Sequence, residues 1–258
     1  MAKVHPTAIV NPEAQLHDTV EIGPYAVIGP HVKIGEGSRV GAHAVIEGRT
    51  TIGKRNRIFQ MSSVGAVPQD LKYAGEDTQL VIGDDNQIRE FTTLHIGTSG
   101  GGGLTKIGNK NLFMANTHVA HDCQVGSHTI FANACQLAGH VTVGDWAIFG
   151  ATTLVHQFVH IGAHAFTGMG TYLPQDLPPY IMAAGNMAKP YGINKEGLKR
   201  RGFSAEAIAG LKRAYKTLYR KGLGLEEATQ ELQEQARACA EVKPILEFLA
   251  RSKRGIIR

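Results

Sequence analysis

The stretch Val20–Ile46, VEIGPYAVIGPHVKIGEGSRVGAHAVI, decides the fold of this chain because an aliphatic residue recurs in it at every sixth position. The recurring residues are Ile22, Ile28, Ile34, Val40 and Ile46, and a glycine directly follows all but the last of them. A period of six matches neither the 3.6 residues of a helical turn nor the simple alternation of a strand. It therefore predicts short strands that are joined at regular intervals by turns.

The same period continues on both sides of this stretch. Every sixth position from Val4 to Val64 is aliphatic, and the pattern returns over residues 82–94 after a break at 66–79. A second break covers residues 97–105, after which the pattern resumes one residue out of phase and runs from Ile107 to Ile161. A repeat of this length predicts a solenoid in which each unit buries its apolar face against its neighbours.

Three such segments would close a triangular coil of roughly 18 residues with the aliphatic side chains inside. The many Gly and Asn residues suit turns that need a positive φ. The two breaks are predicted to be loops expelled from the coil, since the first would otherwise bury Asp70 and Glu76. Functional residues gather on loops of this kind.

Helix signals replace the six-residue pattern after Pro178-Pro179-Tyr180. Ser204 is a candidate N-cap for a helix over 205–221 that ends at Gly222, and further helices are expected over 225–240 and 242–251. We therefore expect a β-helical domain over 1–190, with loops at about 66–79 and 97–105, and an α-helical domain over 191–258.

Composition limits the location and the partners of the chain. Three cysteines without a CxxC pair suit a reduced, cytoplasmic protein. Neither a signal-peptide pattern nor an 18-residue apolar run is present, so we expect no stable membrane insertion. The net charge of +5 suits an acidic partner such as nucleic acid, anionic lipid or an acidic carrier protein, but it does not choose among them, and an ordinary solvated surface explains it at least as well.

The chemistry is expected around His118-Val119-Ala120-His121-Asp122. Residues 18 apart should stack in neighbouring coils, which places Gly139 on His121, with His140 beside it. The next coil adds His156 and Gln157 to the same edge. Four histidines beside an aspartate and two glycine-rich loops favour a functional site over a set of structural histidines.

Three functions could use this cluster. Acyl transfer to a hydroxyl needs a base and an N–H donor for the oxyanion, which His121 with Asp122 and the backbone of Gly139 would supply. A zinc hydratase would use three of the histidines as metal ligands instead. A binding scaffold without catalysis is the third possibility, because repeat folds often serve in that way.

Several segments carry a close resemblance to the bacterial UDP-N-acetylglucosamine O-acyltransferases, members of the hexapeptide-repeat acyltransferases. They are QDLKYAGE (69–76), HVAHDC (118–123), LAGHV (137–141), HQF (156–158), QDLPPY (175–180) and EGLKRRGFS (196–204). The resemblance covers nearly the whole chain. It implies a left-handed parallel β-helix followed by helices, and a cytoplasmic homotrimer with its sites between subunits. The implied reaction transfers a 3-hydroxyacyl group from acyl carrier protein to the 3-position of UDP-N-acetylglucosamine, which opens lipid A biosynthesis, with no metal or other cofactor.

The resemblance also assigns roles to individual residues. It makes His121 the general base, Asp122 its orienting partner and Gly139 the oxyanion donor. The residues that it places on the substrate are His118, His140, His156, Gln157, Asp70 and Lys72, with Asn194, Glu196, Arg200 and Arg201 at the nucleotide. Two arginines in a segment without aromatic groups favour a diphosphate over nucleic acid. Ile96, Asp77 and Met187 depart from the family pattern, and the sequence does not tell a 3-hydroxyl from a 3-amino acceptor.

Met169 is the expected acyl-length ruler. The resemblance places it at the floor of an acyl groove, where a bulky residue would shorten the chain. It lies 48 residues beyond His121, which corresponds to a rise of roughly 13 Å along the coils at about 4.8 Å per coil. A zigzag hydrocarbon of about ten carbons spans that rise. We therefore expect a preference for an acyl chain near that length.

Overall fold

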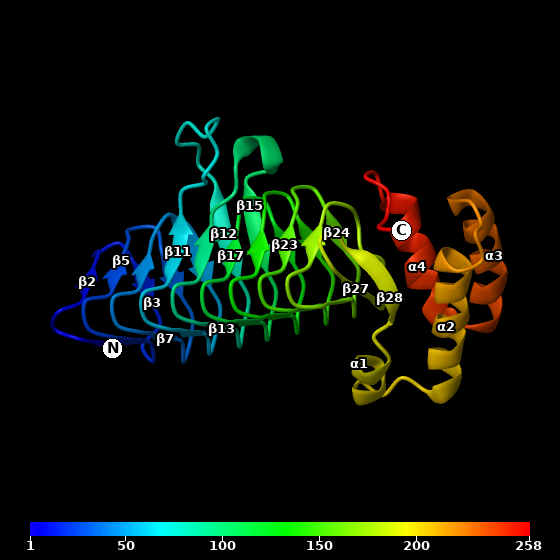
Figure 1. The fold of residues 1–258 in the computed structure, drawn as a ribbon. Coiled ribbons are helices and arrows are strands. Elements are labelled where there is room, and N and C mark those ends of the chain that lie inside the picture. The colour runs from blue at the N-terminus through cyan, green and yellow to red at the C-terminus, as the bar shows by residue number, and fades with distance from the viewer.

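The computed structural model describes residues 1–258, and it is an elongated prism of stacked coils with a cluster of helices at one end (Figure 1). The amino terminus lies at the far end of the prism from these helices. The expected fold class, a left-handed parallel β-helix followed by helices, is confirmed. No helix in the structure is both long enough and apolar enough to span a membrane.

Three sheets form the faces of the prism. The first contains β1 (Lys3–Val4), β4 (Glu21–Ile22), β7 (Arg39–Val40), β10 (Arg57–Ile58), β13 (Gln87–Ile88), β16 (Leu112–Phe113), β19 (Ile130–Phe131), β22 (Ile148–Phe149), β25 (Phe166–Thr167), β27 (Ile181–Ala184) and β28 (Lys189–Ile193). The second contains β2 (Ile9–Val10), β5 (Val27–Ile28), β8 (Val45–Ile46), β11 (Ser63–Ala66), β14 (Thr93–His95), β17 (His118–Val119), β20 (Gln136–Leu137), β23 (Leu154–Val155) and β26 (Tyr172–Leu173). The third contains β3 (Gln15–Leu16), β6 (Lys33–Ile34), β9 (Arg49–Ile52), β12 (Gln79–Ile82), β15 (Leu104–Ile107), β18 (Gln124–Val125), β21 (Thr142–Val143) and β24 (His160–Ile161).

The residues of the six-residue pattern fill the inside of the prism. Val119 on β17 pairs with Leu137 on β20, and both side chains are fully buried. Phe113, Phe131 and Phe149 form a stack along the axis, with ring centroids 4.8 and 4.6 Å apart and planes within 14°. This offset stacking adds to the area that the rings bury. The repeat therefore produces one continuous core, as expected.

Two loops leave the prism where the pattern breaks. One connects β11 to β12, and the other connects β14 to β15 through a 3-10 turn, η1 (Ser99–Gly101). Both loops rise from the same edge of the prism (Figure 1). Strands on either side of them stay paired, so the coils close beneath the loops without a gap in the sheets.

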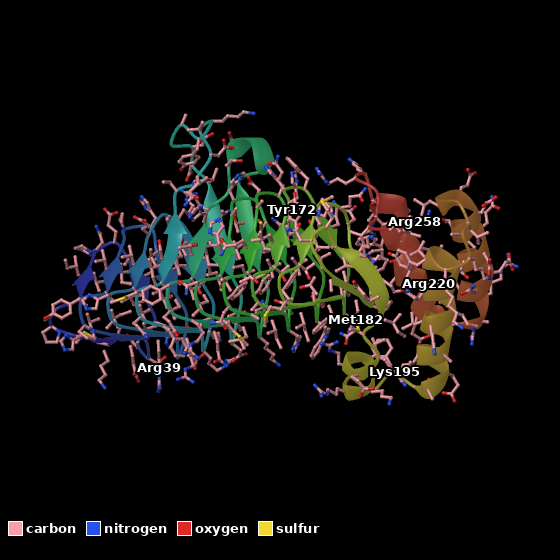
Figure 2. All side chains as sticks on the ribbon, viewed as in Figure 1. Arg39, Tyr172, Met182, Lys195, Arg220 and Arg258 are labelled. Atoms are coloured by element: carbon pink, nitrogen blue, oxygen red, sulfur yellow. The ribbon has the colours of Figure 1, made fainter.

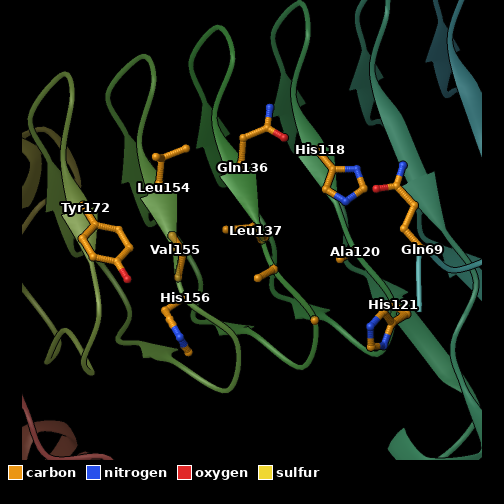
Figure 3. A pocket seen from close by; sticks show the side chains of 12 residues that line it. Gln69, His118, Ala120, His121, Gln136, Leu137, Leu154, Val155, His156 and Tyr172 are labelled. Carbon is orange, nitrogen blue, oxygen red and sulfur yellow. The ribbon is translucent and has the colours of Figure 1, made fainter. Parts of the chain in front are cut away.

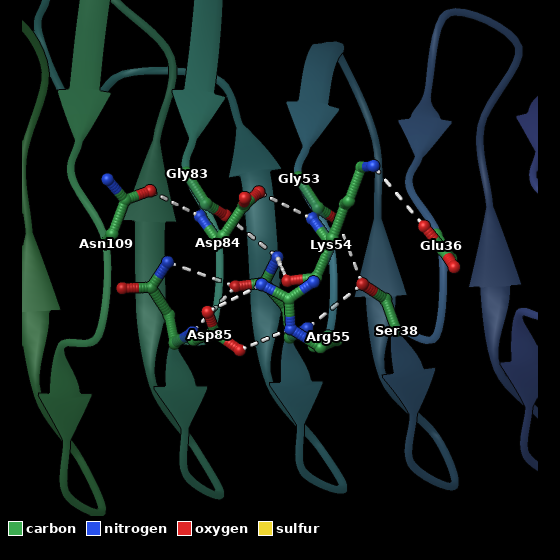
Figure 4. Close-up of polar contacts among 11 residues, drawn as sticks. Glu36, Ser38, Gly53, Lys54, Arg55, Gly83, Asp84, Asp85 and Asn109 are labelled. Carbon is green, nitrogen blue, oxygen red and sulfur yellow. Dashed lines mark hydrogen bonds and ion pairs between the residues drawn. The ribbon is translucent and has the colours of Figure 1, made fainter.

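Polar side chains tie neighbouring coils together along another edge (Figure 4). The Lys54 N–H donates to Asp84 Oδ1 at 2.8 Å, and the Asp84 N–H donates to Asn109 Oδ1 at 2.7 Å. Arg55 and Asp85 form a bidentate ion pair with N–O distances of 2.7 and 2.8 Å. Asp84 and Asn109 thus satisfy corner N–H groups that the strands leave without a partner, and the Arg55–Asp85 pair links the two coils through side chains alone.

The chain turns back on itself before the helices begin, which the sequence did not predict. β27 and β28 form an antiparallel hairpin, whereas helix signals were expected to follow Tyr180 directly. A short helix, α1 (Lys195–Arg200), follows the hairpin and was also missed. Hairpin residues satisfy their backbone groups by pairing with the last coil, so no six-residue repeat is needed there.

The three longer helices lie close to the expected positions. They are α2 (Ala205–Tyr219), α3 (Leu225–Ala238) and α4 (Lys243–Arg251), with a 3-10 turn, η2 (Ala240–Val242), between the last two. The Ser204 hydroxyl accepts the Ala207 N–H, as expected of an N-cap. α2 ends two residues before the expected end, because the Arg220 and Lys221 N–H groups both bond to Lys216 O.

A buried aspartate attaches the C-terminal segment to the last coil. Asp176 Oδ1 accepts the His160 N–H at 2.8 Å, and Asp176 Oδ2 accepts the Ser252 hydroxyl at 2.6 Å. Arg258 donates to Leu218 O at 2.8 Å, and Figure 2 places its side chain among the helices. The carboxyl terminus thus returns to the β-helix and closes the end of its core.

Candidate active site

A cavity of about 440 Å³ lies along the outer face of the second sheet (Figure 3). Gln69, His118 and His121 stand at one end and Tyr172 at the other. Its twelve lining residues are Gln69, His118, Ala120, His121, Gln136, Leu137, Ala138, Gly139, Leu154, Val155, His156 and Tyr172, of which six are hydrophobic. Polar groups at one end of an apolar trough suit a ligand with a polar head and an apolar chain.

His121 and Asp122 form a hydrogen-bonded pair at the polar end. His121 Nδ1 lies 2.8 Å from Asp122 Oδ2, so the ring nitrogen donates to the carboxylate. In the neutral ring this leaves Nε2 as a proton acceptor. The Asp122 side chain is only 1% exposed, whereas that of His121 is 14% exposed and reaches the cavity. The pair therefore has the geometry of a general base and its orienting group.

The loop between β14 and β15 holds Asp122 in place. The Thr98 N–H donates to Asp122 Oδ1 at 2.9 Å, and the Thr98 hydroxyl donates to Asp122 Oδ2 at 2.6 Å. Thr105 Oγ1 accepts the Asp122 N–H at 2.8 Å. A methyl group on Gly101 would come within 2.0 Å of the Asp122 carboxyl carbon, so only glycine fits there. The sequence marked this loop as a break but did not single out Thr98 or Thr105.

Gly139 lies directly against the His121 ring. A methyl group on it would come within 2.6 Å of His121 Cε1 and 2.7 Å of Nε2. Its N–H donates no hydrogen bond within the chain, whereas the next N–H, that of His140, donates to His121 O at 3.0 Å. Gly139 thus offers a free donor beside the nitrogen that would take a proton.

His118 continues the polar wall of the cavity, and His95 is buried beside it. His118 Nδ1 lies 2.7 Å from Thr93 Oγ1, and its ring meets that of His95 edge to face at 4.8 Å. Burial, with smaller contributions from His95 and His121, lowers the pKa of His118 to about 4. Burial likewise lowers the pKa of His95, whose Nδ1 has no hydrogen-bond partner. Both rings are therefore neutral near pH 7.

His140 packs edge to face against His121, with ring centroids 5.0 Å apart. Its Nδ1 is 3.9 Å from Asp122 Oδ2, and its ring stacks on Phe158 at 4.3 Å. Burial lowers the pKa of His140, and the charges of Asp122 and Asp70 oppose that shift. Asp70 belongs to the first loop and does not line the cavity, and its carboxylate accepts the Lys72 N–H. The Lys72 side chain is exposed.

Two further residues expected on the substrate, His156 and Gln157, and the expected ruler Met169 lie farther along. His156 lines the cavity, and its Nδ1 lies 3.1 Å from Gln157 O. Gln157 is exposed, and its side chain is not part of the lining. Met169 is 78% exposed and is also outside the lining. Within one chain, the trough ends at Tyr172 rather than at Met169.

The expected nucleotide residues lie away from this cavity. Asn194 caps α1 by accepting the Gly197 N–H and donates to His164 O. Arg201 lies over the Trp146 ring at 5.1 Å and donates to Trp146 O. Glu196 pairs with Lys199 at 3.6 Å, and Arg200 is exposed. None of these residues lines the His121 cavity, so a single chain does not bring the two groups together.

A metal would have to replace contacts that already exist. His121, Asp122 and His140 could offer ligand atoms within 4.8 Å of one another. However, Asp122 Oδ2 already accepts from His121 Nδ1 and from the Thr98 hydroxyl. Tetrahedral zinc with bonds of about 2.0 to 2.1 Å separates its ligand atoms by more than the 2.8 Å found here. The donor set fits a hydrogen-bonded pair better than a zinc centre.

Comparison with known proteins identifies the family of this chain. The acyl-[acyl-carrier-protein]–UDP-N-acetylglucosamine O-acyltransferase of Thiobacillus denitrificans is 61% identical over 258 residues, which is the full length of both chains. The chain belongs to the UDP-N-acetylglucosamine O-acyltransferase family. The family model for domain 2 of these O-acyltransferases matches residues 176–257, and the bacterial transferase hexapeptide model matches residues 13–48.

Solved structures of O-acyltransferases agree with the architecture. The structure of LpxA from Acinetobacter baumannii shares 46% identity with a TM-score of 0.97 and covers 99% of both chains. The UDP-N-acetylglucosamine acyltransferase of Francisella novicida shares 43% identity with a TM-score of 0.97, over 99% of this chain and 94% of that one. The likeness extends through the helices, so the whole chain has the architecture of this O-acyltransferase family.

Proposed function

We propose that this protein transfers a 3-hydroxyacyl group from acyl carrier protein to the 3-hydroxyl of UDP-N-acetylglucosamine, in the first step of lipid A biosynthesis. The full-length relatives with this named activity support the reaction. The observation that carries the mechanism is the His121–Asp122 pair at the polar end of an apolar trough, with the free N–H of Gly139 beside it.

The step begins when His121 Nε2 removes the proton from the sugar hydroxyl. The hydroxyl oxygen forms a bond to the thioester carbonyl carbon, and the Gly139 N–H stabilises the resulting oxyanion. When the carbon–sulfur bond breaks, the imidazolium returns its proton to the leaving thiolate. Asp122 stabilises the imidazolium and keeps Nδ1 protonated without taking that proton itself.

The apolar part of the trough would receive the acyl chain. Leu154 and Tyr172 line it beyond the histidines, and both come from the same sheet face as His118. Met169 would limit the length of the acyl chain from a position just outside this lining. Its side chain is exposed in a single subunit, so a neighbouring subunit would complete the groove that Met169 closes.

The separation of the nucleotide residues from the trough favours a homotrimer. Arg200, Arg201, Asn194 and Glu196 belong to α1 or its caps, and none lines the trough of its own chain. In a trimer with sites between subunits, the residues of one chain would complete the site of another. The sugar and acyl groups would contact His140, His156, Gln157, Asp70 and Lys72. The basic surface would bind the acidic carrier protein in the cytoplasm.

Substitution of the pair tests this mechanism. His121→Ala should lower turnover by roughly a hundred- to ten-thousand-fold, whereas Asp122→Ala should cost less because it leaves the base in place. The assay is mass spectrometry of the product from purified enzyme, the acyl carrier substrate and UDP-N-acetylglucosamine. His31→Ala, at an exposed histidine outside the trough, is the matched control. Wild-type turnover in His121→Ala with an intact melting temperature would refute the assignment.

A further inference from the structure

One oxygen of Asp122 accepts two hydrogen bonds. The His121 Nδ1–H and the Thr98 hydroxyl both donate to Oδ2, at 2.8 and 2.6 Å. The other oxygen, Oδ1, accepts the Thr98 N–H. Thr98 itself is only 6% exposed, so water does not replace its hydroxyl readily. The carboxylate is therefore shared between the base and the loop that covers it.

We infer that Thr98 is a positioning residue that weakens the hold of Asp122 on the protonated form of His121, by donating to the same carboxylate oxygen. This inference rests on the proposed role of His121. The Thr98 hydroxyl donates a charge-assisted hydrogen bond, which withdraws negative charge from the oxygen that faces the imidazole. Without that bond, Asp122 would attract the imidazolium more strongly and His121 would stay protonated to a higher pH.

The loop is shaped to keep this hydroxyl in place. Gly101 packs against the Asp122 carboxyl group so closely that a side chain would displace it. Thr78 donates to Gly97 O at 2.6 Å and anchors the residue before Thr98. Ser99 donates to Glu76 Oε1 at 2.9 Å, which ties the two expelled loops together. These contacts surround Thr98 on both sides and restrict the direction of its hydroxyl.

Other titratable groups also face the pair. His140 lies on one side, with its Nδ1 3.9 Å from Asp122 Oδ2, and Asp70 acts on it from the first loop. His118 and His95 lie on the other side and are neutral near pH 7. Burial raises the pKa of Cys123 to about 12, so this thiol is neutral as well. Among all these groups, only Thr98 and His121 itself donate a hydrogen bond to Oδ2.

The test is the pH dependence of kcat/KM in Thr98→Val. Valine keeps the shape and the backbone N–H of Thr98 but removes the hydroxyl. The midpoint of the acid limb should rise by about half to one pH unit. A hydrogen bond to a charged group shifts the pKa of that group by about one to two units, and only part of this effect is passed on from the carboxylate to the imidazole. Activity should fall several-fold at pH values below the wild-type midpoint and recover towards the wild-type value at high pH. Thr98→Ser should restore the wild-type midpoint.

Thr78→Val is the matched control, because it loosens the same loop without removing a donor from Asp122. Its midpoint should stay at the wild-type value even if its activity falls. A Thr98→Val rate that is lowered equally at every pH would overturn the inference, because the hydroxyl would then serve packing alone. Loss of the folded state in both Thr98→Val and Thr98→Ala would overturn it too. An active His121→Ala would instead show that the proposed base is wrong, independently of Thr98.

Discussion

Replacing Gly139 by alanine tests whether catalysis depends on the position of the His121 ring. The backbone φ at Gly139 is not positive, so alanine brings no conformational strain. The substitution also keeps the N–H that would bind the oxyanion. Its only direct consequence is a methyl group 2.6 Å from His121 Cε1 and 2.7 Å from Nε2.

The size of the effect follows from these distances. Ordinary contacts begin at 3.4 Å, so the ring has to move by about 0.8 Å. Movement by that amount away from Asp122 would stretch the 2.8 Å hydrogen bond beyond the range of protein hydrogen bonds. Because a misplacement of about 1 Å at a reacting group costs roughly a hundredfold, we expect kcat/KM to fall by about that factor.

The measurement is steady-state kinetics with both substrates, together with the melting temperature of the same sample. Gly29→Ala is the control, because its methyl group meets its nearest neighbour, Glu47 Cα, at 3.3 Å and lies outside the trough. That variant should keep wild-type kinetics. If Gly139→Ala also kept wild-type kcat/KM, the close packing of the His121 ring against Gly139 would have no part in catalysis.

Three more substitutions address acyl length, nucleotide binding and stability. Met169→Gly should shift the preferred acyl chain from about ten carbons, the length that spans the roughly 13 Å rise, to a longer one. Competition between acyl carrier substrates of graded length measures this preference. An unchanged length profile would remove Met169 as the ruler. Arg201→Ala should raise KM for the UDP-sugar by roughly tenfold or more, as expected for a lost bond to a charged group; a loss confined to kcat would contradict that role. Burial and the charge of Arg201 lower the pKa of His164 to about 4, below its ordinary value of 6.5, so the folded state binds fewer protons there than the unfolded state. Stability should therefore fall as the pH drops from 6.5 towards 4, and His164→Phe should flatten this fall in urea unfolding curves; an equally steep fall in the variant would show that other groups cause it.

The sequence alone determined the β-helix and the start of the long helices. The six-residue pattern is local, and one aliphatic residue in each segment is enough to specify which side of a short strand faces the core. Stacking at a constant interval then aligned His118 with Gln136 in adjacent strands. Ser204 was recognised as an N-cap for the same reason, because its hydrogen bond reaches only three residues along the chain.

Tertiary structure alone decided which distant groups complete the site. Thr98 reaches Asp122 across 24 residues, and no periodic signal connects an expelled loop to the coil beneath it. The hairpin of β27 and β28 was missed because its residues pair with the last coil and with each other, and not according to the repeat. Arg201 contacts His164 across 37 residues and lies away from the trough. These contacts depend on where a loop or a helix closes onto the prism, and that path is set by packing in three dimensions rather than by residue spacing.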